Sequence, residues 1–482
     1  MSTPQPRIAR STLINLAGAA VPAALLLITV PIYLHLIGEA RYGVLAIVWL
    51  LLGYFGIFDL GFGRAVANRI AALRDAPTEK REEVFWTGWF ISFITGLLGG
   101  LLLYAIGHWL FGNVFVVSTN LRGEVDTALP WLVFALPIAT SLSLLAGTLE
   151  GRQAFLSMNL SQLAGTVTYQ LLPLGIAYVG YNSLAVLIPA AIFGRLVSGL
   201  FLFRACKHHI PLQSVPRMRL SLVKPLLRYG GWITANGITS SLLSVADRFL
   251  IGSRIGMIAV TAYTIPYNIV LYFTIFPKSL RMALFPEFSR SISTDVDELL
   301  RRALLTVTIL LSPLIILAEL LAKPFLIFWI GKTLAQQSSP VAEILLLGVW
   351  LDAVSGISAT YLQGTGRPDL PARFNLWELL PYMVMLWFGI NYLGIVGAAW
   401  AWTIRVGVDC ILLIFASKMQ SIAPIAFLFF LPVVASFFLA QSLSYMSPTY
   451  IGLGALLLLM TATLSYTTIP KSWGDAPEKH IV

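Results

Sequence analysis

Charged residues are scarce in this sequence: Asp, Glu, Lys and Arg together make up 11% of its 482 residues. Soluble domains average about 25% charged residues, so this chain has too little charge to cover a surface that faces water. Hydrophobic residues make up 57%, and the mean hydropathy is +0.82. This composition excludes an ordinary soluble domain and predicts a chain that lies almost wholly in a lipid bilayer.

Residues that hold metals or cofactors are few as well. The two cysteines, Cys206 and Cys410, lack the spacing of a metal site and do not indicate a structural disulfide, and the five histidines form no ligand motif. A G-x-x-x-x-G-K-[ST] nucleotide-binding motif is absent from the sequence. We therefore expect no catalytic residue, no metal and no cofactor. If the protein moves a substrate uphill, an H⁺ or Na⁺ gradient must drive it.

Long apolar runs dominate the chain. A helix needs roughly 20 apolar residues to cross the hydrocarbon core. The first run follows a polar start without a signal-peptide cleavage site, so we expect it to remain as a span. Runs bounded by charge, Gly or Pro predict fourteen spans, at about 12–36, 43–62, 84–110, 128–149, 160–180, 184–203, 232–252, 259–280, 303–322, 341–362, 376–393, 395–416, 424–444 and 450–469.

Basic residues divide unequally between the two sides of this map. With the N-terminus inside, 24 of the 32 Lys and Arg residues fall on the inner side, 5 on the outer side and 3 within spans. Lys and Arg concentrate in the cytoplasmic loops of membrane proteins. The pattern predicts an even number of spans with both termini in the cytoplasm. It also accounts for most of the net charge of +10, which then gives no reason to expect a nucleic-acid partner.

No loop is long enough for an independent catalytic domain. The longest outer loop, about 111–127, carries no sign of a fold. The longest inner segment, 204–231, is basic and contains three prolines, so we expect a linker with an interfacial helix at about 220–227.

An internal repeat runs through the chain. Four short matches occur in the same order in the two halves, with offsets between 208 and 215 residues. Their order makes chance similarity between apolar segments a poor explanation. The matching pairs are 41–46 with 254–259, 150–152 with 365–367, 171–173 with 379–381, and Arg195 with Arg405.

A repeat of six spans keeps the orientation of each half, so the halves would be related by an axis along the membrane normal. We expect an all-α integral membrane fold with two six-helix lobes around a central cavity and two extra C-terminal helices. The expected parts are an N-lobe at 1–203, a cytoplasmic linker at 204–231, a C-lobe at 232–416, and helices 13 and 14 with a cytoplasmic tail at 417–482.

Two stretches carry a family resemblance. Residues 58–71, FDLGFGRAVANRIA, resemble the DxGL…A..R.IA stretch of polysaccharide and O-antigen flippases, and residues 246–252, ADRFLIG, do so as well. A Gly-Arg pair follows spans 4 and 10, and the spans divide into six, six and two. The whole chain is therefore similar to the polysaccharide-transport (Wzx-type O-antigen flippase) branch of the multidrug/oligosaccharidyl-lipid/polysaccharide (MOP) exporter superfamily.

This resemblance implies translocation of an undecaprenyl-diphosphate-linked oligosaccharide, such as an O-antigen, exopolysaccharide or capsule repeat unit. The substrate would cross a bacterial inner membrane by alternating access. The implied partners are this polyprenyl-diphosphate-linked glycan, membrane lipid and proteins of polysaccharide polymerisation or assembly. The protein itself is expected to be a monomer.

Arginines within the spans are candidates for the substrate site, because charges at bilayer depth are costly and usually functional. Arg195 and Arg405 lie midway along spans 6 and 12, and as repeat partners they are expected to face one cavity. Their guanidinium groups could hold a lipid diphosphate in bidentate fashion. The alternative is that each pairs with a carboxylate, and Asp409 lies four residues after Arg405 on the same helix face.

Arg248, Arg64 and Arg281 are further candidates for binding the diphosphate. Arg248 follows Asp247 near the outer end of span 7, where a structural ion pair or a snorkelling side chain is the alternative. Arg64 and Arg281 end spans 2 and 8 at the inner face, where arginine is also an ordinary topology signal.

Carboxylates within the spans are candidates for coupling to an ion gradient. Asp352 lies midway along span 10 with no basic residue within four positions, so it could carry a proton or bind Na⁺. Its alternative is a partner arginine from another helix, such as Arg405. The further candidates are Asp59, Glu378 and Asp409. Two other acids, Glu319 and Glu343, are expected near the outer face in contact with solvent.

Span 1 contains Pro22 and Pro31. Proline interrupts the hydrogen-bond ladder of a helix and permits bending. We expect a gate in this span, and a static kink is the alternative.

Two other functions fit parts of the sequence. A drug or small-cation exporter of the same superfamily would favour acids over arginines in the cavity, and such exporters usually have twelve spans. A membrane enzyme, such as a polysaccharide polymerase or ligase, would carry a large outer loop with catalytic Arg or His. The predicted loops are too short for this, so the sequence favours a transporter.

Overall fold

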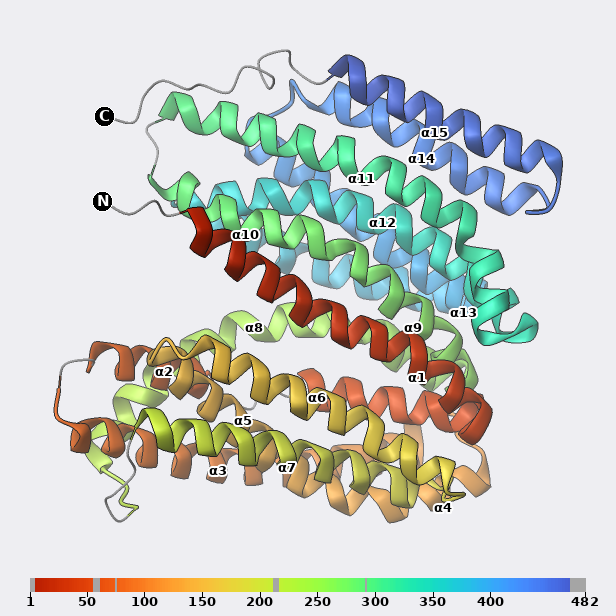
Figure 1. Ribbon diagram of the computed structural model, residues 1–482. Helices are drawn as coiled ribbons and strands as arrows, with labels where there is room; N and C mark the ends of the chain where they lie inside the picture. Colours follow the sequence, from red (N-terminus) through yellow and green to blue (C-terminus); the bar gives the residue numbers. More distant parts are fainter. Residues whose placement is uncertain (1–4, 55–60, 74–75, 211–215, 291–292, 469–482) are drawn as a thin grey trace. The chain divides into compact units, whose positions relative to one another are not determined.

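Helices joined by short turns make up the computed structural model of the chain (Figure 1). The structure describes residues 5–54, 61–73, 76–210, 216–290 and 293–468. The chain divides into two compact units, Met1–Thr264 and Ile265–Val482. The expected all-α fold is confirmed in both units.

The first unit contains eight α-helices and the start of a ninth within the described residues. A π-helical turn, Leu110–Val114, follows the third helix, and a 3₁₀ turn, Leu129–Trp131, precedes the fifth. The helices are α1 (Gln5–Tyr54), α2 (Phe62–Ala72), α3 (Thr78–Trp109), α4 (Thr119–Ala128), α5 (Leu132–Gly151), α6 (Phe155–Tyr178), α7 (Leu184–His209), α8 (Leu220–Arg254) and α9 (Met257–Val270).

The second unit begins within α9. A 3₁₀ turn, Leu271–Thr274, joins α9 to the next helix. The remaining helices are α10 (Ile275–Arg290), α11 (Ser293–Ile330), α12 (Lys332–Gly364), α13 (Asp369–Ala416), α14 (Ala423–Ser442) and α15 (Pro448–Thr468).

Ten helical stretches of the described residues are long and apolar enough to cross a membrane. Helix α13 contains two of the predicted spans, 376–393 and 395–416. Two more, 12–36 and most of 43–62, fall within α1. The chain is a multi-pass membrane protein, and the total of fourteen spans stays a prediction.

Glycine marks the break inside each of these two long helices. Gly38 interrupts α1 with φ 78° and ψ 166°, and Gly394 interrupts α13 with φ 62° and ψ −139°. A side chain with a Cβ strongly disfavours positive φ, whereas glycine adopts it readily. The two glycines therefore let the chain turn between spans with almost no connecting loop. Helix α1 continues through Pro22 and Pro31, and its break at Gly38 lies beyond both prolines.

Residues with positive φ occur at matching places in the two halves of the chain. Three such pairs lie in the turns after spans 1 and 7, 4 and 10, and 5 and 11. Their offsets of 218, 213 and 214 residues are close to those of the sequence matches. The pairs are Gly38 with Gly256, Gln153 with Gly366, and Gly180 with Gly394.

The prediction that residues 111–127 form a loop without a fold is wrong in part. This segment contains most of α4. Leu121, Val125 and Ala128 are buried along one face of this helix. Their spacing of four and three residues is that of a helix whose apolar stripe faces a core. The average hydropathy of α4 is far below that of the spans, so a search for long apolar runs does not reveal this helix.

Glu124 fastens α4 to two other helices of the first unit. The Nε and Nη2 atoms of Arg41 on α1 donate to its two carboxylate oxygens over 3.0 and 2.6 Å. The backbone N–H of Leu184, the first residue of α7, donates to the same carboxylate over 2.9 Å. A bidentate Arg–carboxylate pair combines charge with fixed geometry, so this contact defines how α1, α4 and α7 meet.

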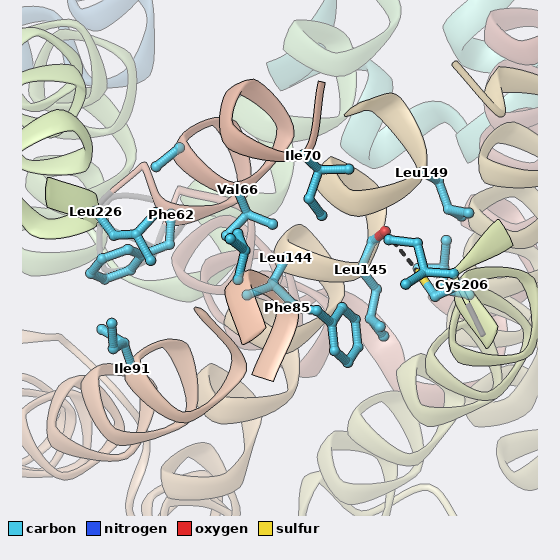
Figure 2. Packing of buried hydrophobic residues seen from close by; sticks show 14 residues of the cluster. Phe62, Val66, Ile70, Phe85, Ile91, Leu144, Leu145, Leu149, Cys206 and Leu226 are labelled. Carbon is cyan, nitrogen blue, oxygen red and sulfur yellow. Dashed lines mark hydrogen bonds between the residues drawn. The ribbon is translucent and has the colours of Figure 1, made fainter. Parts of the chain in front are cut away.

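A buried apolar cluster holds α2 against its neighbours (Figure 2). Phe62, Val66 and Ile70 of α2 pack with Phe85 of α3 and Leu144 of α5. Their spacing of four residues places them on one side of the short helix. The other members drawn in Figure 2 include residues of α7 and α8, with the Cys206 thiol donating to the carbonyl oxygen of Leu145 over 3.3 Å.

Glycines allow α2 and α5 to approach very closely. A Cβ at Gly147 would clash with the backbone carbonyl of Gly63, and a Cβ at Gly63 would clash with Ser143. Small residues at helix contacts are typical of membrane proteins, where tight packing replaces the hydrophobic effect between helices.

Gly147→Ala is expected to destabilise the protein, because the added methyl group has no room beside Gly63. Overpacking of this kind costs about 1–3 kcal/mol. Thermal unfolding of the purified protein in detergent, followed by tryptophan fluorescence, measures the change.

Gly175→Ala is the matched control. Gly175 lies within α6 and a Cβ there would meet no atom within 4 Å. Alanine favours a helix over glycine by roughly 0.5–1 kcal/mol, so this variant should be as stable as the original or slightly more so. Equal stability of the two variants would contradict the close packing of α2 on α5.

Candidate functional site

A polar pocket of about 330 Å³ lies between α5, α6 and α7 in the first unit. Ligand pockets have volumes of about 300–1,000 Å³, so it can hold a headgroup-sized portion of a ligand. Its polar lining residues are Ser143, Gln162, Thr166, Tyr169, Arg195 and Ser198.

Arg195 reaches this pocket because α6 and α7 pack closely. A Cβ at Gly194 would crowd the backbone of Tyr169, and a Cβ at Gly165 would clash with Ser198. The guanidinium carbon of Arg195 consequently lies 4.6 Å from the centre of the Tyr169 ring. This is a cation–π contact, which leaves the N–H groups at the edge of the guanidinium plane available to a ligand.

Aromatic contacts hold Tyr169 in place from behind. Its ring centre lies 6.1 Å from that of Trp49, and Trp49 lies 5.7 Å from Tyr33. The Tyr33 hydroxyl in turn donates to the carbonyl oxygen of Gln170 over 2.8 Å. These contacts tie α1 to α6, so the residue on which Arg195 rests is fixed by two helices.

Arg195 has no carboxylate partner in the described part of the chain. The ion pairs of the first unit involve other arginines, such as Arg41 with Glu124 and Arg219 with Glu83. A half-buried guanidinium without a counter-ion is costly in a membrane. The arrangement thus suits an anionic ligand.

Arg405 has a different environment in the second unit. Its Nη1 atom lies 3.5 Å from a carboxylate oxygen of Glu378, and both side chains are largely buried, at 14% and 5% exposure. The guanidinium also lies 5.5 Å from the centre of the Tyr382 ring. The structure thus pairs Arg405 with a carboxylate from the other side of the Gly394 break, where the sequence suggested Asp409.

Further carboxylates adjoin this ion pair. Asp409 lies within electrostatic range of Arg405, Glu378 and Asp352. We call Asp352, Glu378, Asp409 and Arg405 the acid cluster. If all four groups were ionised, it would carry two uncompensated negative charges among the described residues. Burial makes that state costly, and a proton or a small cation bound to the cluster would lower this cost.

Arg248 lies in a closed network in the first unit. Its side chain is 3% exposed, and Nη1 lies 3.3 Å from Asp247 and donates to the carbonyl oxygen of Ser244 over 2.6 Å. The hydroxyl of Tyr263 donates to the other oxygen of Asp247 over 2.8 Å. These contacts correspond to the structural ion pair that was the alternative for Arg248.

The other predicted residues have environments of their own. Arg64 is exposed on α2, and the guanidinium of Arg281 on α10 packs against Gly356 of α12. Asp59 lies outside the described residues. Pro22 and Pro31 lie within α1, and their role in gating stays a prediction.

The expectation that Glu319 and Glu343 contact solvent is wrong. Their exposures are 0% and 2%. Glu319 contacts Ser436, and Glu343 accepts a hydrogen bond from Gln441 over 2.5 Å. Both partners belong to α14, which covers these acids, and the sequence alone gives no means of placing α14 over them.

The tyrosines beneath the two arginines were not found from the sequence. In each unit the arginine lies over a tyrosine of the preceding predicted span, Tyr169 for Arg195 and Tyr382 for Arg405. The available signal was an aromatic residue near the Leu-Leu-Pro match, in the span before each arginine. The sequence contains 58 Trp, Tyr and Phe residues, and spacing alone does not rank them, so that signal was too weak.

A multi-pass helical fold with ionisable groups buried in both units is typical of membrane transporters. Comparison with known proteins is more specific. Residues 35–339 match the family described as polysaccharide biosynthesis protein, and the chain belongs to this family.

Two relatives by sequence cover most of the chain. A Shigella flexneri protein named as an O-antigen transporter is 28% identical over 410 residues, which are 84% of this chain and 96% of that protein. The teichuronic acid biosynthesis protein TuaB of Bacillus subtilis (strain 168) is 24% identical over 363 residues, 72% of this chain and 69% of that protein.

Solved structures with the same fold are transporters and flippases. The lipid II flippase MurJ, in an inward closed conformation, aligns with a TM-score of 0.73 and 15% identity over 94% of this chain and 99% of its own. An inward-facing MATE family multidrug transporter of the MOP superfamily aligns with a TM-score of 0.65 and 16% identity over 83% and 98%. The chain thus belongs to the polysaccharide biosynthesis protein family and has the fold of these transporters and flippases, in agreement with the resemblance found in the sequence.

Arg405→Ala is expected to destabilise the protein, because it leaves Glu378 buried beside other acids without its cation. Removing one partner of a buried ion pair costs about 3–5 kcal/mol, and the lower end suits a pair that retains some exposure. Thermal unfolding in detergent measures this loss, and adding Glu378→Gln to the variant should restore part of it.

Arg195→Ala is the comparison, since no carboxylate among the described residues depends on this arginine. It should lower the unfolding temperature much less than Arg405→Ala does. Equal losses in the two variants would mean that Arg195 also has an essential structural partner.

Proposed function

We propose that the chain translocates an undecaprenyl-diphosphate-linked oligosaccharide across the bacterial inner membrane by alternating access. Family membership supports this, as do the relatives named for O-antigen transport and teichuronic acid biosynthesis. The fold shared with a lipid II flippase is consistent with a lipid-linked substrate. An O-antigen, exopolysaccharide or capsule repeat unit would fit equally.

The observation that carries the proposal is the environment of Arg195. A cation that has no carboxylate partner in the described chain lies in a polar pocket, with its flat face on Tyr169. Its free edge can bind phosphate oxygens in bidentate fashion. The neighbouring Gln162, Ser143 and Thr166 supply hydrogen-bonding groups for further phosphate or sugar oxygens.

The acid cluster supplies the coupling step of the proposal. When H⁺ or Na⁺ is absent, Glu378 neutralises Arg405. When Glu378 or Asp409 binds a proton or Na⁺, the positive charge of Arg405 is less neutralised and attracts the diphosphate more strongly. Ion binding and substrate binding in the second unit then favour each other.

The remaining parts of the proposal rest on the sequence pattern. The distribution of Lys and Arg supports cytoplasmic termini, and the offsets of the matches and of the positive-φ turns support two repeated six-span lobes. In this arrangement Arg195 and Arg405 serve one substrate, Arg64 and Arg281 receive it at the inner face, and α1 acts as the gate. Proteins of polysaccharide assembly would take up the product of a monomeric flippase.

Export of a small organic cation is the second candidate function. The excess of carboxylates over arginines in the acid cluster favours it, since such a substrate needs acidic partners. The two functions differ in the charge of the substrate, so competition by a lipid diphosphate or by an organic cation separates them.

Arg195→Ala should slow translocation of a fluorescent polyprenyl-diphosphate-linked sugar in proteoliposomes. Hydrogen bonds to a charged group contribute about 1.5–3 kcal/mol, so we expect a loss of roughly 10–100-fold at limiting substrate, since 1.4 kcal/mol is a factor of ten. Arg195→Lys should recover only part, because an ammonium group cannot bind in bidentate fashion. Arg301→Ala, at an exposed pair on α11, is the control.

Undiminished translocation by both Arg195→Ala and Arg405→Ala would contradict diphosphate binding by these arginines. Inhibition by an organic cation, with none by a lipid diphosphate, would favour the second function.

Asp352→Asn should abolish the stimulation of transport by an imposed H⁺ or Na⁺ gradient, because it removes a charge from the acid cluster. Transport down a substrate gradient should persist in this variant. Parallel assays with each gradient identify the ion, and Asp369→Asn, at an exposed ion pair, is the control. Unchanged gradient dependence in Asp352→Asn would exclude Asp352 from coupling.

A further inference from the structure

A second set of buried polar groups lies between α11, α12 and α14. Glu319 of α11 and Glu343 of α12 face Ser436 and Gln441 of α14. Glu319 is fully buried, and Glu343 is 2% exposed. We call these four residues the α14 seam. None of them belongs to the acid cluster or to the pocket at Arg195.

The hydroxyl of Ser436 meets two oxygens. One is a carboxyl oxygen of Glu319, and the other is the carbonyl oxygen of Val433 at 2.9 Å. A serine hydroxyl has one hydrogen to donate, and a backbone carbonyl can only accept. If Ser436 donates to Val433, the hydrogen between Ser436 and Glu319 must come from Glu319.

The other carboxyl oxygen of Glu319, Oε1, is buried and has no hydrogen-bond partner among the described residues. An ionised carboxylate would place part of its charge on this bare oxygen, and an unsolvated charge is far more costly to bury than a neutral acid. The protonated acid leaves only a carbonyl-like oxygen unpaired.

The groups that face Glu319 give it no counter-charge. Its own helix contributes Lys323, which interacts with Glu343. From α12 comes the like charge of Glu343, and from α15 the hydroxyl of Tyr450, which donates to the carbonyl oxygen of Leu320 over 2.7 Å. Helix α14 carries no acidic, basic or tyrosine residue.

Glu343 has the opposite environment. The side-chain amide of Gln441 donates to it over 2.5 Å, and Lys323 lies within electrostatic range. Burial disfavours the ionised form of Glu343, whereas the nearby ammonium group and the amide donor favour it. The two acids of the seam therefore differ in what surrounds them, although they are close enough to interact.

We propose that Glu319 is a proton-binding site: its carboxyl group holds a proton in the folded protein and donates a hydrogen bond through it to the Ser436 hydroxyl. Loss of the proton breaks the O–H bond of Glu319 and transfers the proton to water. The carboxylate left behind can bind Ser436 only if that hydroxyl gives up Val433. It would also repel the ionised form of Glu343, so release of the proton loosens α14 from α11.

Infrared spectroscopy of the full-length protein in detergent tests the proposal. Protonated carboxylic acids have a C=O stretching band separate from that of carboxylates. At neutral pH, Glu319→Gln should remove one such band from the spectrum, and Glu343→Gln should leave it in place. Glu298→Gln, an exposed acid on the same helix that binds Arg302, should also change nothing in this region.

The variant Ser436→Ala tests which acid gives the band, because it changes the hydrogen-bond partner of Glu319 and leaves Glu319 itself unchanged. Removal of the hydrogen-bond partner should shift the frequency of the band that Glu319→Gln abolishes. An unchanged protonated-acid region in both Glu319→Gln and Ser436→Ala would overturn the proposal. Loss of the band in Glu343→Gln instead would place the proton on the other acid and would equally contradict it.

Thermal unfolding provides a second measurement. Glutamine resembles protonated glutamate in shape and can donate to Ser436, so Glu319→Gln should unfold at a temperature close to that of the original at neutral pH. At alkaline pH the original should lose stability and the variant should lose less. The same decline with pH in both proteins would count against a proton that holds α14.

Discussion

The cost of placing ionised groups inside hydrocarbon governs this structure. A soluble protein leaves most of its charges in water, whereas this chain has few charges and buries several of them in its helical units. Each buried charge therefore needs a partner, a bound ion, a proton or a substrate. The first unit offers Arg195 a tyrosine ring and a polar pocket, and the second gives Arg405 an acid. These different solutions suggest different tasks for two residues that occupy equivalent places in the predicted repeat.

Helix packing determines where these groups meet. Between helices in lipid there is little hydrophobic driving force, so contact depends on close approach. Gly165 and Gly194 bring α6 and α7 together and thereby place Arg195 over Tyr169. Gly394 folds α13 back on itself and brings Glu378 to Arg405, although 27 positions separate them in the chain. The polar sites thus depend on residues that have no polar side chain.

The all-α, multi-pass fold followed from the sequence because hydropathy depends on the length and spacing of apolar runs along the chain. The partners of the buried charges did not follow, because they depend on which faces of different helices meet. Asp409 was the natural partner of Arg405 by helical spacing, yet the structure pairs Arg405 with Glu378 across a glycine break. Glu319 lies near the end of a predicted span and was expected to meet solvent, but α14 covers it. Helical periodicity describes one helix at a time, so it does not show which other helix packs over a given side chain.

The paired positive-φ turns bear on the ancestry of the chain. A turn that needs positive φ accepts few residues besides glycine, so its backbone conformation can outlast changes in the side chains around it. The two halves match in only a few short stretches, but their turns change direction at corresponding places. At one of these places Gln153 adopts the conformation that Gly366 adopts in the other half. This pattern agrees with the predicted two-lobe repeat, which is then easier to recognise in the turns than in the helices.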